Sequence, residues 1–182
     1  MVRDEELKRL VRYMEGMGVK VEFKRGDPNN SVGAEWDLSG THIVVYTYPR
    51  IPKTDLILCL IHECGHHLSF VHDDNKQHPR GLSKAIELEN LGLPMTKRQR
   101  KLILESELKG MKWWDIIYRE TNMKFPKYKL WYAREYDTWW YNYFYQVGKY
   151  PIRKEKIIKH KQLREVFNKH MDVEGYQISH GL

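Results

Sequence analysis

The chain has 182 residues, of which 41% are hydrophobic and 30% charged, and this composition excludes a disordered or a membrane-embedded protein. Two cysteines are too few for a disulfide framework, so we expect a reducing, cytoplasmic setting. Acidic residues Asp4, Glu5 and Glu6 stand where a secretory signal would need apolar ones, so no such signal is expected. The net charge of +7 comes mainly from residues 122–182, where basic residues are twice as frequent as acidic ones.

Hydrophobic patterning predicts an α+β fold with a small antiparallel sheet, covered by C-terminal helices. A first helix, with Leu7, Leu10 and Met14 on one face, precedes three short strand-like segments. An apolar helix beginning at Thr54 or Asp55 follows, and we expect it to be the central buried helix. The first helix spans Asp4–Met17, and the three strands span Val19–Phe23, Val32–Leu38 and Thr41–Tyr46. After the central helix, the predicted helices are Leu82–Leu91, Thr96–Thr121, Lys129–Val147 and Lys154–His170.

The buried helix continues into an H-E-x-x-H pattern, His62-Glu63-Cys64-Gly65-His66. Residues four apart share one helix face, so the imidazoles of His62 and His66 can bind one metal ion. Zinc suits two such ligands and leaves positions for a third ligand and for water. Glu63 follows the first ligand directly, from where its carboxylate can act as general base on the metal-activated water. The pattern therefore predicts a zinc site with Glu63 as the catalytic residue, and Cys64 pointing away from the ligands.

Two histidines further along the chain are candidates for the third ligand. His72 has the spacing found in metzincins, but Ser69 stands where those enzymes need a glycine to break the helix. His78 would suit an SprT-like arrangement, in which a histidine follows the motif by a dozen residues.

Two glutamates of the predicted helix Thr96–Thr121 compete with these histidines. On a helical wheel, Glu107 lies at the centre of the apolar arc, whereas Glu105 lies among lysines on the polar face. A carboxylate in a core-facing stripe is costly unless a cation meets it. The wheel therefore favours Glu107, and Gly110, one turn later, indicates a place where another helix approaches closely.

Between Leu7 and Thr121 the chain resembles the ImmA/IrrE-like class of gluzincin-type zinc metallopeptidases, which includes many small phage and mobile-element proteins. The resemblance rests on the order helix, small sheet, H-E-x-x-H helix and glutamate helix. The segment Leu104–Gly110 is similar to the E-x-x-A segment of that class, with Gly110 in place of the alanine. The resemblance implies that Glu107 is the third ligand and that the protein cuts a regulatory protein, such as a transcriptional repressor.

We expect two parts, a zincin-like core over residues 1–121 and a basic, aromatic-rich helical extension over residues 122–182 packed on that core. The aromatic spacing of the extension favours internal packing with a solvated basic face over binding of nucleic acid. One of Tyr132, Tyr136 and Tyr141 could donate to an oxyanion, and the sequence does not choose among them. Two alternatives stay open: an SprT-like protease that acts on DNA-bound proteins, and a non-catalytic zinc-containing binding module.

Overall fold

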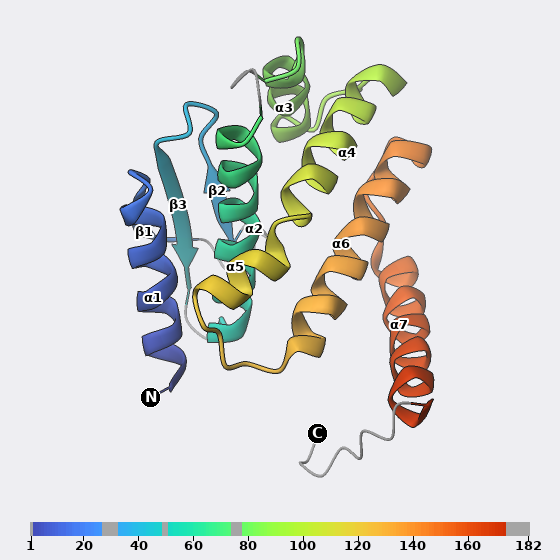
Figure 1. Ribbon diagram of the computed structural model, residues 1–182. Coiled ribbons are helices and arrows are strands. Elements are labelled where there is room, and N and C mark those ends of the chain that lie inside the picture. The colour runs from blue at the N-terminus through green and yellow to red at the C-terminus, as the bar shows by residue number, and fades with distance from the viewer. Residues whose placement is uncertain (1, 27–32, 49–50, 74–77, 174–182) are drawn as a thin grey trace.

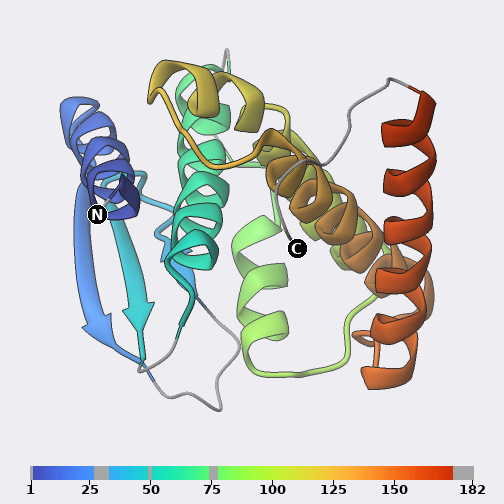
Figure 2. The ribbon, with the colours of Figure 1, turned by 90° about the horizontal axis from the view of Figure 1, so that it is seen from below.

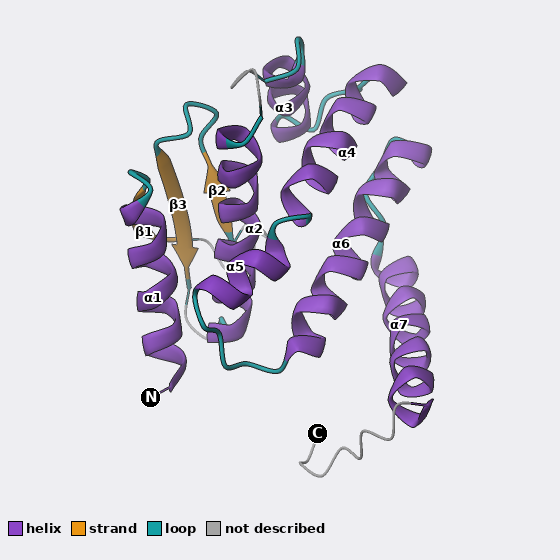
Figure 3. Ribbon diagram, in the orientation of Figure 1, coloured by secondary structure: helices purple, strands orange, loops and turns teal. Residues whose placement is uncertain are grey.

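The computed structural model describes residues 2–26, 33–48, 51–73 and 78–173, so the predicted strand start at Val32 lies outside the described residues. The fold is α+β, mostly helical with a three-stranded sheet (Figures 1 and 3). The elements are α1 (Val2–Gly16), β1 (Lys20–Arg25), β2 (Ala34–Trp36), β3 (His42–Thr47), α2 (Lys53–Val71), α3 (Leu82–Asn90), α4 (Lys97–Met111), α5 (Trp114–Glu120), α6 (Lys127–Val147) and α7 (Arg153–Val173).

The sheet is mixed, which corrects the antiparallel sheet expected from the sequence. β3 is the central strand: β2 pairs with it antiparallel, and β1 pairs with it parallel along the opposite edge. A tight turn at Gly40, whose φ is 76°, joins β2 to β3 and makes them antiparallel neighbours. β1 is not joined to β3 by a hairpin. Alternating apolar and polar residues in Val19–Phe23 identify β1 as a strand, but this pattern does not specify whether β1 runs parallel or antiparallel to β3.

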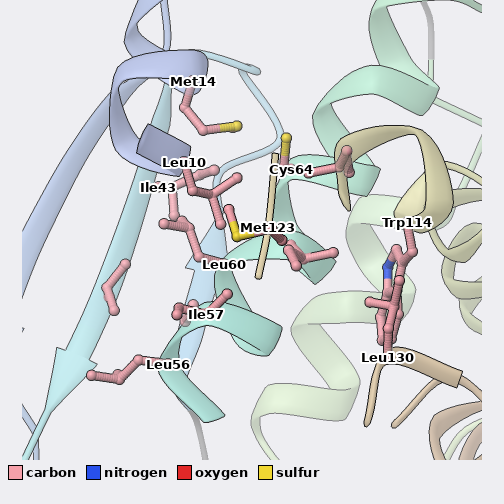
Figure 4. Close-up of a cluster of buried hydrophobic side chains, with 14 of the residues drawn as sticks. Leu10, Met14, Ile43, Leu56, Ile57, Leu60, Cys64, Trp114, Met123 and Leu130 are labelled. Carbon is pink, nitrogen blue, oxygen red and sulfur yellow. The ribbon is translucent and has the colours of Figure 1, made fainter. Parts of the chain in front are cut away.

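α1 and α2 pack against the sheet and enclose the main hydrophobic core (Figure 4). On β3, Ile43 and Val45 are fully buried, while the intervening Val44 is only half-buried, as expected for a strand with one covered face. α2 is the central buried helix, as predicted, with Ile57 and other apolar residues wholly inside. Cys64 also lies in this core, so it points away from the ligand face, as predicted.

The later helices stack outward from α2 and do not cover the sheet, which corrects a second expectation. α4 lies between α2 and α6, and α7 is outermost (Figures 1 and 2). The expected helix Thr96–Thr121 is two helices, because the chain turns after Met111 with the Trp113 N–H donating to the Gly110 carbonyl at 3.1 Å. The turn directs Trp114 into the core, where it is 1% exposed. Along the described residues, none of the helices combines the length and apolar character that crossing a bilayer requires.

Candidate metal centre

His62 and His66 project from the same face of α2. Their Nε2 atoms are 3.1 Å apart, and both rings are largely shielded from solvent. The apolar first half of α2 is buried in the core, which gives these side chains a rigid support. α2 continues unbroken through Ser69 to Val71, so the helix break that a metzincin-like arrangement needs at Ser69 does not occur.

Glu107 of α4 faces the two histidines. Its Oε2 atom lies 2.9 Å from His62 Nε2 and 3.3 Å from His66 Nε2, and its side chain is 14% exposed. Glu105 instead is 52% exposed and pairs with Lys101 at 3.6 Å. The inward direction of Glu107 and the outward direction of Glu105 are both as predicted.

A pair of glycines allows α4 to approach α2 at this point. A Cβ atom on Gly65 would overlap the carbonyl group of Gly110, and one on Gly110 would lie 3.1 Å from His66 Nδ1. The start of α4 is fixed by a capping box in which the side chains of Thr96 and Gln99 each accept from the other's backbone N–H. The close approach of another helix that Gly110 predicted is therefore confirmed. This approach sets the distance between Glu107 on α4 and the two histidines on α2.

A triangle that fits one metal ion is formed by three atoms: Nε2 of His62, Nε2 of His66 and Oε2 of Glu107. His62, His66 and Glu107 are the group of possible ligands found among the described residues. Tetrahedral zinc with bonds near 2.0–2.1 Å separates its ligand atoms by about 3.3 Å, close to the three distances observed. Glu107 Oε2 is buried, and no properly directed hydrogen bond satisfies it. Two imidazole nitrogens and one carboxylate oxygen are a donor set that zinc accepts.

The electrostatics of the triangle favour a positive charge at its centre. Burial lowers the pKa of His62, but the Glu107 carboxylate, together with Asp137, raises it well above the usual value. Burial raises the pKa of Glu107, but the His66 and His62 rings lower it well below its usual range. The raised pKa of His62 therefore places a proton on that ring beside the Glu107 carboxylate, and a bound cation would displace the proton.

Glu63 is held beside the triangle and outside it. Its Oε2 atom accepts a hydrogen bond of 3.0 Å from the backbone N–H of Trp36 on β2. Burial raises the pKa of Glu63, and the nearby His62 and His66 rings oppose this rise. A carboxylate tied to the sheet in this way is positioned next to the candidate metal ligands without being one of them.

The other two candidate ligands lie away from the triangle. His72 caps the end of α2, is exposed, and stacks on Trp113 with ring centroids 4.6 Å apart. His78 contacts the Leu38 carbonyl at 2.9 Å through Nε2 and stacks on Phe70 at 4.7 Å. Neither histidine joins His62 and His66 in the structure.

Asp137 of α6 is a site residue that the sequence analysis missed. Its Oδ2 atom lies 3.7 Å from His62 Nδ1, on the side of the ring opposite the triangle. A sequence signal was present, because Ala133 and Tyr141 lie one turn before and after Asp137 and both pack against the core. Like Glu107 on α4, Asp137 on α6 is an acidic residue among apolar residues that face the interior.

The structure distinguishes among the three candidate tyrosines. Tyr132 and Tyr136 stack on His160 of α7, with ring centroids 5.8 Å and 4.5 Å from it. Tyr141 instead packs against the main core, and burial and surrounding carboxylates raise its pKa well above the usual value. Those carboxylates belong to Glu107, Asp137, Glu89 and Glu63. Its phenol therefore stays protonated and can donate a hydrogen bond.

A small cavity opens on one side of His66, between the end of α2 and α4. Trp36 stacks on the His66 ring with an interplanar angle of 11° and forms one wall. Phe70 and His78 form part of another wall, and polar side chains, among them Ser69, complete the lining. A small side chain of a bound molecule could enter here next to the metal ligands.

Comparison of the chain with protein-family models, curated proteins and solved structures finds no match. Membership of the ImmA/IrrE-like class therefore stays a prediction. The chemistry of the site rests on its own geometry, which brings together the three predicted ligands and, held separately, the carboxylate of Glu63.

Proposed function

We propose that this protein is a zinc-dependent metallopeptidase of the ImmA/IrrE-like kind, with His62, His66 and Glu107 as its metal ligands. The observation that carries the proposal is the triangle of donor atoms with sides of 2.9, 3.1 and 3.3 Å. Glu63, fixed beside it by the Trp36 backbone, adds the base that hydrolysis requires. A structural zinc site would be closed by a fourth protein ligand, and none is present among the described residues.

The residues around the triangle divide the work of hydrolysis. When bound there, zinc would supply Lewis acidity toward a peptide carbonyl and would acidify a water molecule. Glu63 accepts the proton of the attacking water and passes it to the leaving amine. Tyr141 donates its phenolic proton in a hydrogen bond to the carbonyl oxygen, where negative charge develops.

The edge of the sheet favours an extended peptide as substrate. Over the described residues, β2 pairs with β3 along one edge, and the N–H of Trp36 on the other edge points toward Glu63. An extended chain that lies along this free edge would pass the metal ligands, as in recognition by strand addition. By the resemblance, the substrate is a regulatory protein such as a transcriptional repressor.

The test combines metal analysis with a hydrolysis assay. Zinc-loaded protein is incubated with a library of proteome-derived peptides, and new termini are identified by mass spectrometry. Wild type should hold one zinc ion per chain and cut peptides, whereas Glu63→Gln should keep the zinc and lose about 10²–10⁴-fold in rate. Glu105→Gln removes a surface carboxylate and serves as the matched control. Zinc binding without any cleavage would favour the binding module instead, and an unchanged Glu63→Gln rate would remove Glu63 from its role.

A further inference from the structure

α6 presents one acidic side chain to the metal centre. The inward face of this helix carries Leu130, which belongs to the main core, Ala133 and Tyr141, which pack against it, and the buried Phe144. Asp137 shares their face, because it stands four residues from both Ala133 and Tyr141. Its side chain is 33% exposed.

The partner of this carboxylate is the His62 ring. Within the described residues, the ion pair recorded for Asp137 is the one with His62, and no lysine or arginine is paired with it. The gap of 3.7 Å between Oδ2 and Nδ1 closes to a hydrogen bond of about 2.8 Å when the side chain moves by about 1 Å. A hydrogen bond from Nδ1–H to Asp137 leaves the lone pair of Nε2 directed at the triangle.

His66 is oriented by a different means. Its ring stacks on Trp36, and its Nδ1 atom packs near Gly110. Across the part of the chain that the structure describes, the carboxylate paired with His66 is that of Glu107. His62 also packs against an aromatic ring, that of Trp114 at 5.6 Å, but in the described residues it pairs in addition with a second carboxylate, which α6 supplies from the opposite side.

We propose that Asp137 is a positioning residue that orients His62 for metal binding, so that α6, outside the part of the chain that resembles zinc peptidases, completes the metal centre. The inference rests on the proposed zinc site. It assigns to residues 122–182 a role in the site itself, beyond packing on the core. It also explains why an acidic residue stands in the aromatic, inward-facing stripe of α6.

The experiment measures zinc affinity by competition with a chromophoric chelator. Asp137→Ala should weaken zinc binding by about 10–100-fold, the range typical for loss of a carboxylate that supports a ligating histidine. Asp137→Asn, whose amide oxygen still accepts from Nδ1–H, should recover part of this loss. Glu135→Ala removes the same charge from α6 two residues earlier, on a different face, and should bind zinc like wild type.

A spectroscopic measurement separates orientation of His62 from a general effect on folding. In the cobalt-substituted protein, Asp137→Ala should shift the visible absorption bands, which report ligand geometry, while Glu135→Ala should not. Equal zinc affinities and unchanged spectra for Asp137→Ala and wild type would overturn the inference and leave the proposed function standing. Absence of zinc binding by wild type would overturn both.

Discussion

The interface between α2 and α4 and the interface between α6 and α7 bury groups of different kinds. Where α4 crosses α2, the backbones of Gly65 and Gly110 are in contact, without side chains between them. Between α6 and α7 the contacts are made by rings, such as Tyr128 with Phe167 at 5.0 Å and Tyr136 with His160 at 4.5 Å.

This difference matches what each interface has to hold. Two backbones in contact have one distance of closest approach, so they fix the separation of the ligands on α2 from Glu107 on α4. Stacked and tilted rings have broad energy minima and tolerate small shifts of one helix along another. α6 borders both regions, because Asp137 lies 3.7 Å from His62 of α2 while Tyr132 and Tyr136 stack on His160 of α7.

The largest effect is expected from a methyl group placed between α2 and α4. In Gly65→Ala the new Cβ would overlap the Gly110 carbonyl group and lie 3.3 Å from Trp114 Cδ1, so α4 must move away. We expect a loss of about 3 kcal/mol in the free energy of unfolding, together with weaker zinc binding. Urea unfolding and chelator competition measure the two effects.

Gly16→Ala is the matched control for this substitution. Gly16 is the last residue of α1, and a Cβ atom there would meet nothing within 4 Å. The change should leave zinc affinity unaltered and should be neutral or slightly stabilising. Equal stability of Gly65→Ala and Gly16→Ala would show that the α2–α4 contact is as tolerant as the ring contacts.

The second prediction separates the two glutamates of α4. Glu107→Ala removes one of three ligands and should weaken zinc binding by more than about 100-fold, whereas Glu105→Ala should leave it unchanged. Metal content after dialysis against a mild chelator distinguishes the two variants. Retention of zinc by Glu107→Ala with loss from Glu105→Ala would reverse the assignment, and retention by both would return the third-ligand role to a histidine.

The third prediction concerns the inner face of α6. Tyr141→Phe keeps the ring that packs against both hydrophobic clusters and removes the phenolic hydroxyl that faces the carboxylates. Loss of one oxyanion donor should lower kcat by about 100-fold, with little change in KM or in zinc content. Tyr132→Phe, on the α7 side of the same helix, is the control and should keep full kcat. Equal rates for both variants would leave Tyr141 as a packing residue.

Much of the metal centre was predictable because its ligands lie in strongly periodic helices. The spacing of His62 and His66 and the apolar arc around Glu107 each specify a helix face, and the structure places all three side chains together. Asp137 was missed because α6 is aromatic on several sides, which masks the spacing that Asp137 shares with the inward-facing Ala133 and Tyr141. The Trp36 contact to Glu63 is made by a backbone N–H, which no side-chain pattern encodes.

Two of the three errors in the fold have a common origin in long-range packing. Alternation identified β1 as a strand and β-branched residues identified β3, but parallel pairing depends on which edge of β3 remains free after the β2–β3 hairpin forms. The apolar arc of the predicted helix Thr96–Thr121 continued past Gly110, yet the chain turns there and Trp114 enters the core beside α2. In both cases local periodicity is correct, and tertiary contacts decide the geometry.

The smallest effect is expected at the α6–α7 interface, on acidification. Burial lowers the pKa of His160, and the nearby Arg164 lowers it further, so the folded state favours the neutral ring between Tyr132 and Tyr136. The stabilisation is complete above the ordinary pKa of about 6.5 and is lost as the pH falls through the lower, folded-state value. Because the ring is partly exposed, we expect the loss to be below about 1 kcal/mol.

His160→Phe tests this expectation, because phenylalanine can stack on the same two tyrosines and cannot take up a proton. The free energy of unfolding of the metal-free wild type should fall more than that of His160→Phe between pH 7.5 and pH 5. The difference between the two proteins isolates His160 from the other histidines, including His62, whose raised pKa acts in the opposite direction. Identical pH profiles would mean that the ring contacts hold α7 regardless of charge, and a steeper profile for His160→Phe would reverse the sign argued for this interface.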